Sequence, residues 1–124
     1  MRISDHFMFS EFACRCGCGG GDLDGLRSLC GALEVVRSEA GDKPIIITSG
    51  YRCRRHNRAI KGAKASRHMQ SNAADFRVSG MEPAEVLALC ERLISEGKIP
   101  EGGLASGSTF VHYDLRGQRA RWTY

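Results

Sequence analysis

The chain has 124 residues, 42% of them hydrophobic, and a formal net charge of +4. This length and composition support one hydrophobic core, so we expect residues 1–124 to form a single domain, and we expect a monomer. No stretch approaches the ~20 apolar residues that a membrane-spanning helix needs, which excludes membrane insertion by that route. The positive charge suits an acidic polymer, and it does not choose between nucleic acid and anionic cell wall.

The N-terminal region is polar and rich in cysteine. Three ionisable residues interrupt the apolar core that a secretory signal would need: Asp5, His6 and Glu11. We therefore expect cytoplasmic synthesis without a signal peptide. Three cysteines follow, too closely spaced for a dispersed disulfide framework: Cys14, Cys16 and Cys18. Together with Cys53 they could form a structural metal site or a local disulfide, and reduced, packed thiols are a further alternative.

The first half of the chain predicts a helix, a strand and a loop. Apolar residues recur at spacings of three and four over 23–39, which predicts an amphipathic helix that stops at Gly41. A β-branched run at 44–48 predicts a buried strand. Residues 49–71 are rich in Arg, Lys, Gly and Ser and lack either hydrophobic period, so they predict a long ordered loop, which in a small domain is usually functional.

The second half predicts the rest of a small mixed fold. Residues 72–78 could form a strand, and 83–94 form a second amphipathic helix that begins at a proline. A Gly-rich connection at 102–107 precedes an alternating strand at 109–115, and 119–124 could pair back on that strand as a hairpin. This order favours an α+β domain with helices packed on one face of a small antiparallel sheet.

Two of the four histidines lie near carboxylates in segments predicted to be ordered, His68 near Asp75 and His112 near Asp114. Catalytic zinc typically takes three ligands from His and Asp or Glu and leaves a fourth position for water. His68, Asp75 and His112 would supply that set. Without a further pattern, each histidine would more often be an ordinary loop or strand residue.

Residues 66–75, SRHMQSNAAD, resemble the S-x-H-x-x-G-x-A-x-D signature of zinc D-Ala-D-Ala carboxypeptidases and L-alanyl-D-glutamate endopeptidases. The departure is Ser71, where that family usually has glycine. The segments ITSGYR at 47–52 and FVHYD at 110–114 also look like this family. FSEFAC at 9–14, with the cysteines, resembles its phage and prophage members. The resemblance therefore covers nearly the whole chain.

The resemblance implies a hedgehog/DD-peptidase-like fold and an endolysin-like zinc peptidase that acts on peptidoglycan peptides in the periplasmic or extracellular cell wall. Its zinc ligands would be His68, Asp75 and His112. Arg52 would bind a substrate carboxylate or a developing oxyanion, because its fork of N–H donors matches either group. Ser66 and Tyr51 would bind substrate.

The general base is not identified by this resemblance. Many relatives carry glutamate three residues before the last histidine, where this chain has Thr109. Residues two apart in a strand share a face, so Asp114 should lie on the side of His112 and either activate the water or buttress a ligand. The alternative is a salt bridge from Asp114 to Arg116 or Arg119. The reserve candidates for the base are His56 and Glu101.

Two other functions are compatible with parts of the sequence. The missing glutamate would suit a non-catalytic zinc-containing binding module of the same fold, similar to the hedgehog signalling domain. The basic segment 52–67 would suit nucleic acid, but it lacks the interleaved aromatic residues or the reading helix that such binding uses. We therefore expect a peptidoglycan peptide as the partner and no nucleic acid.

Overall fold

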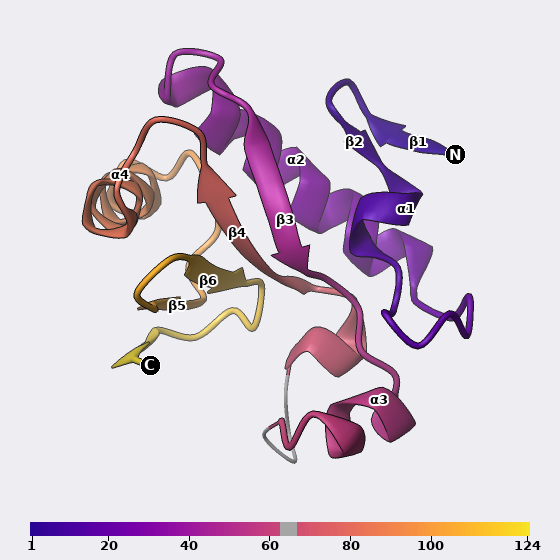
Figure 1. The fold of residues 1–124 in the computed structure, drawn as a ribbon. Helices are drawn as coiled ribbons and strands as arrows, with labels where there is room; N and C mark the ends of the chain where they lie inside the picture. The colour runs from indigo at the N-terminus through magenta and orange to yellow at the C-terminus, as the bar shows by residue number, and fades with distance from the viewer. Residues whose placement is uncertain (63–66) are drawn as a thin grey trace.

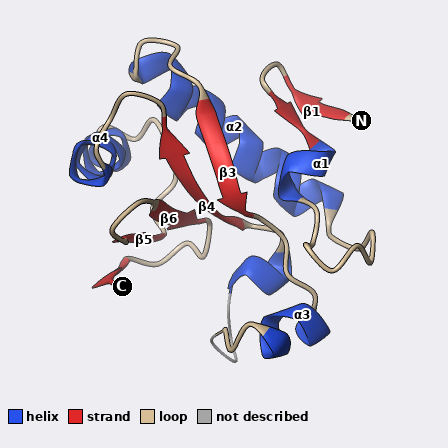
Figure 2. Cartoon of the chain, viewed as in Figure 1, coloured by secondary structure: helices blue, strands red, loops and turns tan. Residues whose placement is uncertain are grey.

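The computed structural model describes residues 1–62 and 67–124, and its centre is a five-stranded sheet (Figures 1 and 2). The strand order is β3-β4-β6-β5-β7. The strands are β3 (Ile45–Ser49), β4 (Ala73–Val78), β5 (Gly103–Ser106), β6 (Val111–Asp114) and β7 (Ala120–Thr123). Neighbouring strands are antiparallel except β5 and β7, which are parallel. This arrangement of helices and a small, mainly antiparallel sheet confirms the predicted α+β class.

Two amphipathic helices, α2 (Leu23–Glu39) and α4 (Pro83–Ser95), contact β4 and each other, as the hydrophobic periods predict. The Asp22 side chain caps α2 by accepting hydrogen bonds from two backbone N–H groups of its first turn. Pro83 begins α4, where its missing N–H costs nothing. Neither helix, nor any other in residues 1–62 and 67–124, has the length and apolar character needed to cross a membrane.

The N-terminal segment forms elements that the hydrophobic pattern does not predict. A short hairpin of β1 (Arg2–Ser4) and β2 (Phe7–Met8) leads into one turn of helix, α1 (Phe9–Phe12). The hairpin lies against α2, and Phe7 and Phe12 are buried with ring centroids 5.7 Å apart. Elements this short contain too few residues for a period to emerge.

The predicted long loop at 49–71 contains two helical segments, α3 (Arg54–Ala59) and the 3₁₀ turn η1 (Arg67–Gln70). The prediction missed α3 because its sequence, RRHNRA, has no apolar residue with helical spacing, and Asn57 is its buried residue. A cysteine rather than an apolar face anchors it, since Cys53 Sγ accepts a hydrogen bond from the His56 N–H at its N-terminus.

Two predictions near the C-terminus are wrong. The Gly-rich segment at 102–107 contains strand β5, because Gly102 and Gly103 lie where a Cβ atom would collide with Asp114 on the neighbouring strand. The segment at 119–124 does not form a hairpin with β6. Both edges of β6 are already occupied by β4 and β5, so β7 pairs with the free edge of β5 instead.

Candidate metal centre

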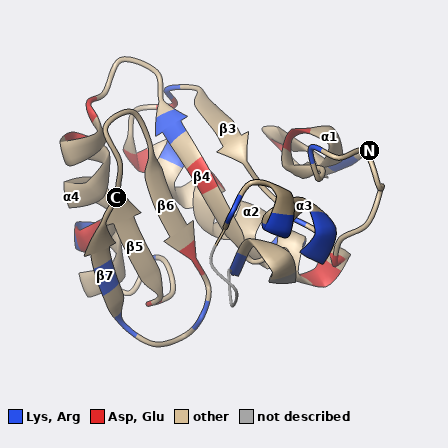
Figure 3. Cartoon of the chain, turned by 60° about the horizontal axis from the view of Figure 1, so that its bottom comes forward, with Lys and Arg blue, Asp and Glu red and all other residues tan. Residues whose placement is uncertain are grey.

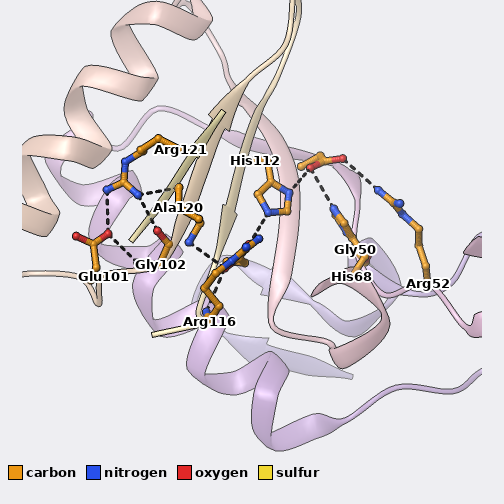
Figure 4. Close-up of polar contacts among 12 residues, drawn as sticks. Gly50, Arg52, His68, Glu101, Gly102, His112, Arg116, Ala120 and Arg121 are labelled. Atoms are coloured by element: carbon orange, nitrogen blue, oxygen red, sulfur yellow. Dashed lines mark hydrogen bonds and ion pairs between the residues drawn. The ribbon is translucent and has the colours of Figure 1, made fainter. Parts of the chain in front are cut away.

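The three predicted ligands meet at one point, although they come from η1, β4 and β6. Asp75 and His112 are directly opposite each other in the β4–β6 register, and η1 precedes β4 in the chain. Asp75 Oδ1 lies 3.1 Å from His68 Nε2 and 3.0 Å from His112 Nδ1. All three side chains are buried. Figure 4 shows the two imidazoles and Arg52 around this carboxylate.

Each histidine is oriented by an acceptor on its other ring nitrogen. His68 Nδ1 donates to the carbonyl oxygen of Gly50 at 2.7 Å, and His112 Nε2 donates to Asp114 Oδ2 at 2.7 Å. Because these acceptors cannot donate, the proton of each neutral imidazole lies on that outer nitrogen. The inner nitrogens, His68 Nε2 and His112 Nδ1, therefore carry the lone pairs that face Asp75. Such outer partners are typical of metal-binding histidines.

This donor set fits a cation. Two imidazole lone pairs and a carboxylate oxygen at these separations repel one another unless a proton or a metal ion lies between them. Burial alone would raise the pKa of Asp75, but the two imidazoles beside its carboxylate outweigh burial and lower this pKa to about 2. Burial alone would lower the pKa of His112, and its carboxylate partners Asp114 and Asp75 raise it. Two histidines and one carboxylate are a typical catalytic zinc set, so zinc is the cofactor that the site fits.

Asp114 is fully buried, and both of its carboxylate oxygens accept hydrogen bonds. Besides His112, it accepts hydrogen bonds from the Gly103 backbone N–H at 2.9 Å and from Arg116, whose guanidinium contacts both carboxylate oxygens at 2.9 and 2.7 Å. Burial would raise the pKa of Asp114, but these donors hold it far below its usual range. The salt bridge to Arg116 and the contact with His112 thus coexist. This position suits a residue that buttresses His112 better than one that takes a proton from water.

Arg52 lies beside the ligands. Its Nη2 is 3.5 Å from Asp75 Oδ2, while Nη1 donates to Asn57 Oδ1 at 3.2 Å and Nε to Ser49 Oγ at 3.3 Å. Its backbone N–H donates to the His68 carbonyl at 2.9 Å. The side chain is therefore held in one place, with its charge at the edge of the metal centre.

A cleft of about 590 Å³ opens over the ligands. Four basic residues line it: Arg52, Lys61, Arg67 and Arg116. Three aromatic residues also line it: Phe110, Trp122 and Tyr124. The Trp122 ring packs 5.1 Å from the His112 ring, and the Arg116 guanidinium lies 5.1 Å from the Trp122 ring centroid. Figure 3 shows further basic residues on α3, the helix that follows Arg52 in the chain. Among the described lining residues, Asp75 is the only carboxylate.

Other predicted site residues lie elsewhere. Tyr51 lines a separate small pocket, where its ring lies against Gly20 and Gly21, and it is not among the residues lining the cleft. The reserve candidate Glu101 binds Arg121 at 2.9 Å, and neither it nor His56 lines the cleft. Ser66, predicted to bind substrate, lies outside the described residues.

Ser71, at the glycine position of the motif, has a φ of 57°, so a non-glycine residue occupies the left-handed region here. Its hydroxyl accepts a hydrogen bond from the Asp22 N–H at 2.8 Å, which ties the loop to the start of α2. The serine therefore adds a contact that glycine could not make.

The sequence reasoning missed the Gly50 carbonyl and the Gly103 N–H, because backbone groups leave no residue-type signal. It also gave no role to Trp122, although 119–124 was expected to be a strand of a hairpin. Trp122 faces the metal centre only because β7 pairs with β5. In this register Ala105 of β5 is opposite His112 of β6 on one side and opposite Trp122 of β7 on the other.

Comparisons with known proteins agree with this geometry. The family model described as Peptidase M15 matches residues 5–114. The chain is also similar to a zinc D-Ala-D-Ala carboxypeptidase of Streptomyces albus G, with 43% identity over 44 residues. That match covers 36% of this chain and 17% of the relative, so the aligned part is a small fraction of the relative's length.

Proposed function

Because the chain belongs to the peptidase M15 family, we propose that it is a zinc-dependent peptidase that hydrolyses the stem peptides of bacterial peptidoglycan. The observation that carries this proposal is the ligand set His68, Asp75 and His112, with each imidazole oriented by an outer acceptor and with a cleft above it. The similar carboxypeptidase supports the D-Ala-D-Ala bond as one target. The bond between L-Ala and D-Glu is the other target that we consider.

The charge of the cleft supports this substrate class. Stem peptides carry carboxylates at their C-terminus and on their D-Glu residue, and the four basic residues defined above would attract and orient such groups. The three aromatic side chains provide an apolar wall for the short alanine side chains. Nucleic acid is a weaker fit, because the basic segment 52–67 contains no Phe, Trp or Tyr on which bases could stack.

The reaction would proceed by direct attack of water on the scissile carbonyl. When bound, zinc supplies Lewis-acid chemistry, polarising the carbonyl and lowering the pKa of the attacking water to roughly 7. Asp114 and Gly50 hold the two imidazoles in the tautomers that ligation requires. Arg52, fixed by Asn57 and Ser49, would donate hydrogen bonds to the oxyanion that forms, or to the terminal carboxylate of the substrate.

Digestion of purified peptidoglycan tests the proposal. A carboxypeptidase would release free D-Ala, whereas an endopeptidase would create new amino termini on D-Glu, and mass spectrometry distinguishes the two products. Activity should disappear with a chelator and return with zinc. A His112→Ala variant serves as the inactive control. Digestion that is unaffected by complete metal removal would refute the proposal.

A non-catalytic zinc module of the same fold is the second candidate. Thr109 at the position of the usual glutamate favours it, as does the engagement of Asp114 with four groups of the protein. Such a module would bind stem peptides in the zinc-loaded state and leave them intact after prolonged incubation. Binding with turnover would exclude it.

A further inference from the structure

A second cluster of potential metal ligands lies outside the cleft. Three of its members come from the loop that follows α1, and the fourth caps α3: Cys14, Cys16, Cys18 and Cys53. Their four sulfur atoms all lie within 4.8 Å of one another. The Cys14–Cys16, Cys16–Cys53 and Cys14–Cys53 sulfur separations are 3.3, 3.5 and 3.7 Å, and all four thiols are free.

These separations match a tetrahedral metal site. Four thiolates bound to zinc at 2.3 Å lie about 3.8 Å from one another along the edges of the tetrahedron. A disulfide would pair two sulfurs and leave the others with no reason to converge. Here Cys16 approaches both Cys14 and Cys53, so the sulfurs surround one point and do not separate into two pairs.

The surrounding backbone is arranged to stabilise thiolates. Three sulfurs accept backbone N–H hydrogen bonds: Cys14 from Cys53 at 3.4 Å, Cys18 from Gly20 at 3.4 Å and Cys53 from His56 at 3.3 Å. Such donors lower the cost of negative charge on sulfur and are common around metal-bound cysteines. Gly17, between Cys16 and Cys18, and Gly19, directly after Cys18, have φ values of 79° and 72°, so glycine allows the chain to turn beside these cysteines.

We propose that Cys14, Cys16, Cys18 and Cys53 bind a second zinc ion with a structural role. All four coordination positions would be filled by protein, which is the mark of a structural rather than a catalytic zinc site. Two of the thiols, Cys16 and Cys18, are exposed, so the site lies at the surface, where metal has access to it.

The position of this site gives it a role in the candidate metal centre. Cys53 directly follows Arg52, and the Tyr51 N–H donates to the Phe12 carbonyl at 2.8 Å just before the cysteine loop begins. Gly50, whose carbonyl orients His68, packs so closely on the Phe12 backbone that a Cβ atom would not fit. A zinc ion at the cysteines would therefore clamp the N-terminal segment onto the strand end that positions Arg52 and His68.

Zinc content and coordination test the proposal directly. Wild-type protein purified under reducing conditions should hold about two zinc ions per chain, and a His68→Ala/His112→Ala variant should keep about one. X-ray absorption of that variant should show sulfur neighbours at about 2.3 Å, in place of nitrogen and oxygen at about 2.0–2.1 Å. If the histidine variant does not fold, the wild-type spectrum still reports the sulfur neighbours.

A matched pair of cysteine variants completes the experiment. Cys16→Ser/Cys18→Ser should lose about one zinc ion and keep the histidine-bound one, whereas Cys30→Ala and Cys90→Ala, which change buried core thiols, should lose none. A zinc spectrum without sulfur, iron in place of zinc, or a disulfide among the four cysteines in freshly purified protein would overturn the proposal. None of these outcomes depends on whether the chain cuts peptidoglycan.

Discussion

Replacing Asp114 by asparagine tests how the fold holds the metal. The carboxylate accepts the His112 Nε2–H bond on Oδ2, which also accepts from Arg116 Nη2, while Oδ1 accepts from Gly103 and from Arg116 Nε. The carbonyl oxygen of an asparagine can take the place of Oδ1 and accept the hydrogen bonds from Gly103 and Arg116 Nε. Its NH₂ group then faces His112, and the imidazole must accept at Nε2 and carry its proton on Nδ1. That tautomer points a proton, not a lone pair, at the metal.

The structure sets the size of this effect. Loss of a partner that orients a metal-bound histidine typically costs 10–100-fold in metal affinity, which corresponds to about 1.4–2.8 kcal/mol. Asp114 is completely buried, so water cannot replace it, and we expect the upper part of this range. The fold should be retained, because the Gly103 and Arg116 donors keep one oxygen acceptor.

Competition with a chelator, followed by measurement of the zinc that remains bound, quantifies the change in affinity, and ¹⁵N NMR of His112 reports its tautomer. The matched control is Glu91→Gln, which also removes a carboxylate paired with an arginine, Arg121, and does not contact the metal ligands. If the Asp114→Asn protein retains zinc as wild type does, with His112 Nε2 still protonated, Asp114 does not set the tautomer of His112.

Three further changes have expected outcomes. Arg52→Met should lower kcat/KM on peptidoglycan fragments by about 10²-fold while zinc content is unchanged, because it removes the oxyanion donor. Thr109→Glu should raise kcat by about 10²-fold or more by supplying a general base. Arg121→Met should destabilise the fold more at neutral pH than in acid, because acid removes the ion pairs of Arg121 but not its hydrogen bonds to the Gly102 and Ala120 carbonyls. Hydrogen bonds from Arg121 lower the pKa of Glu91 and Glu101, so their stabilisation is full above the unfolded pKa of about 4.3 and is lost as the pH falls further. Urea unfolding from neutral pH to about pH 3 measures this.

Each of these variants has a matched control. Arg52→Lys keeps the charge and loses the fork, so it should recover part of the activity if charge contributes. Thr109→Gln has a similar size to the glutamate and no base, so a rate increase with Gln would contradict the base assignment. Arg119, a neighbouring exposed arginine with contacts of 3.7 Å, should matter little for stability when changed to Met. An Arg121→Met effect that is equal at all pH values would show that the ion pairs are not its cause.

The two long helices could be predicted from the sequence because their signal is local. Each repeats apolar residues at helical spacing over three or more turns, and each has a recognisable start signal: the N-cap Asp22 for α2 and Pro83 at the first position of α4. The segment β5 could not, because its glycines signal flexibility until the neighbouring Asp114 is known to occupy the space of a Cβ atom. The pairing of β7 could not either, since it depends on which sheet edge is still free.

For the site, the residue types could be predicted from the sequence: His68, Asp75 and His112 in the order of a recognisable family, and four cysteines as a possible second set of ligands. Three features follow from the folded chain alone: which nitrogen of each histidine faces the metal, the support of His112 by Asp114, and the contact of Cys53 with the N-terminal thiols. This difference arises because ligand identity is a property of single residues. Ligand direction, in contrast, is set by strand register and by hydrogen bonds between segments tens of residues apart.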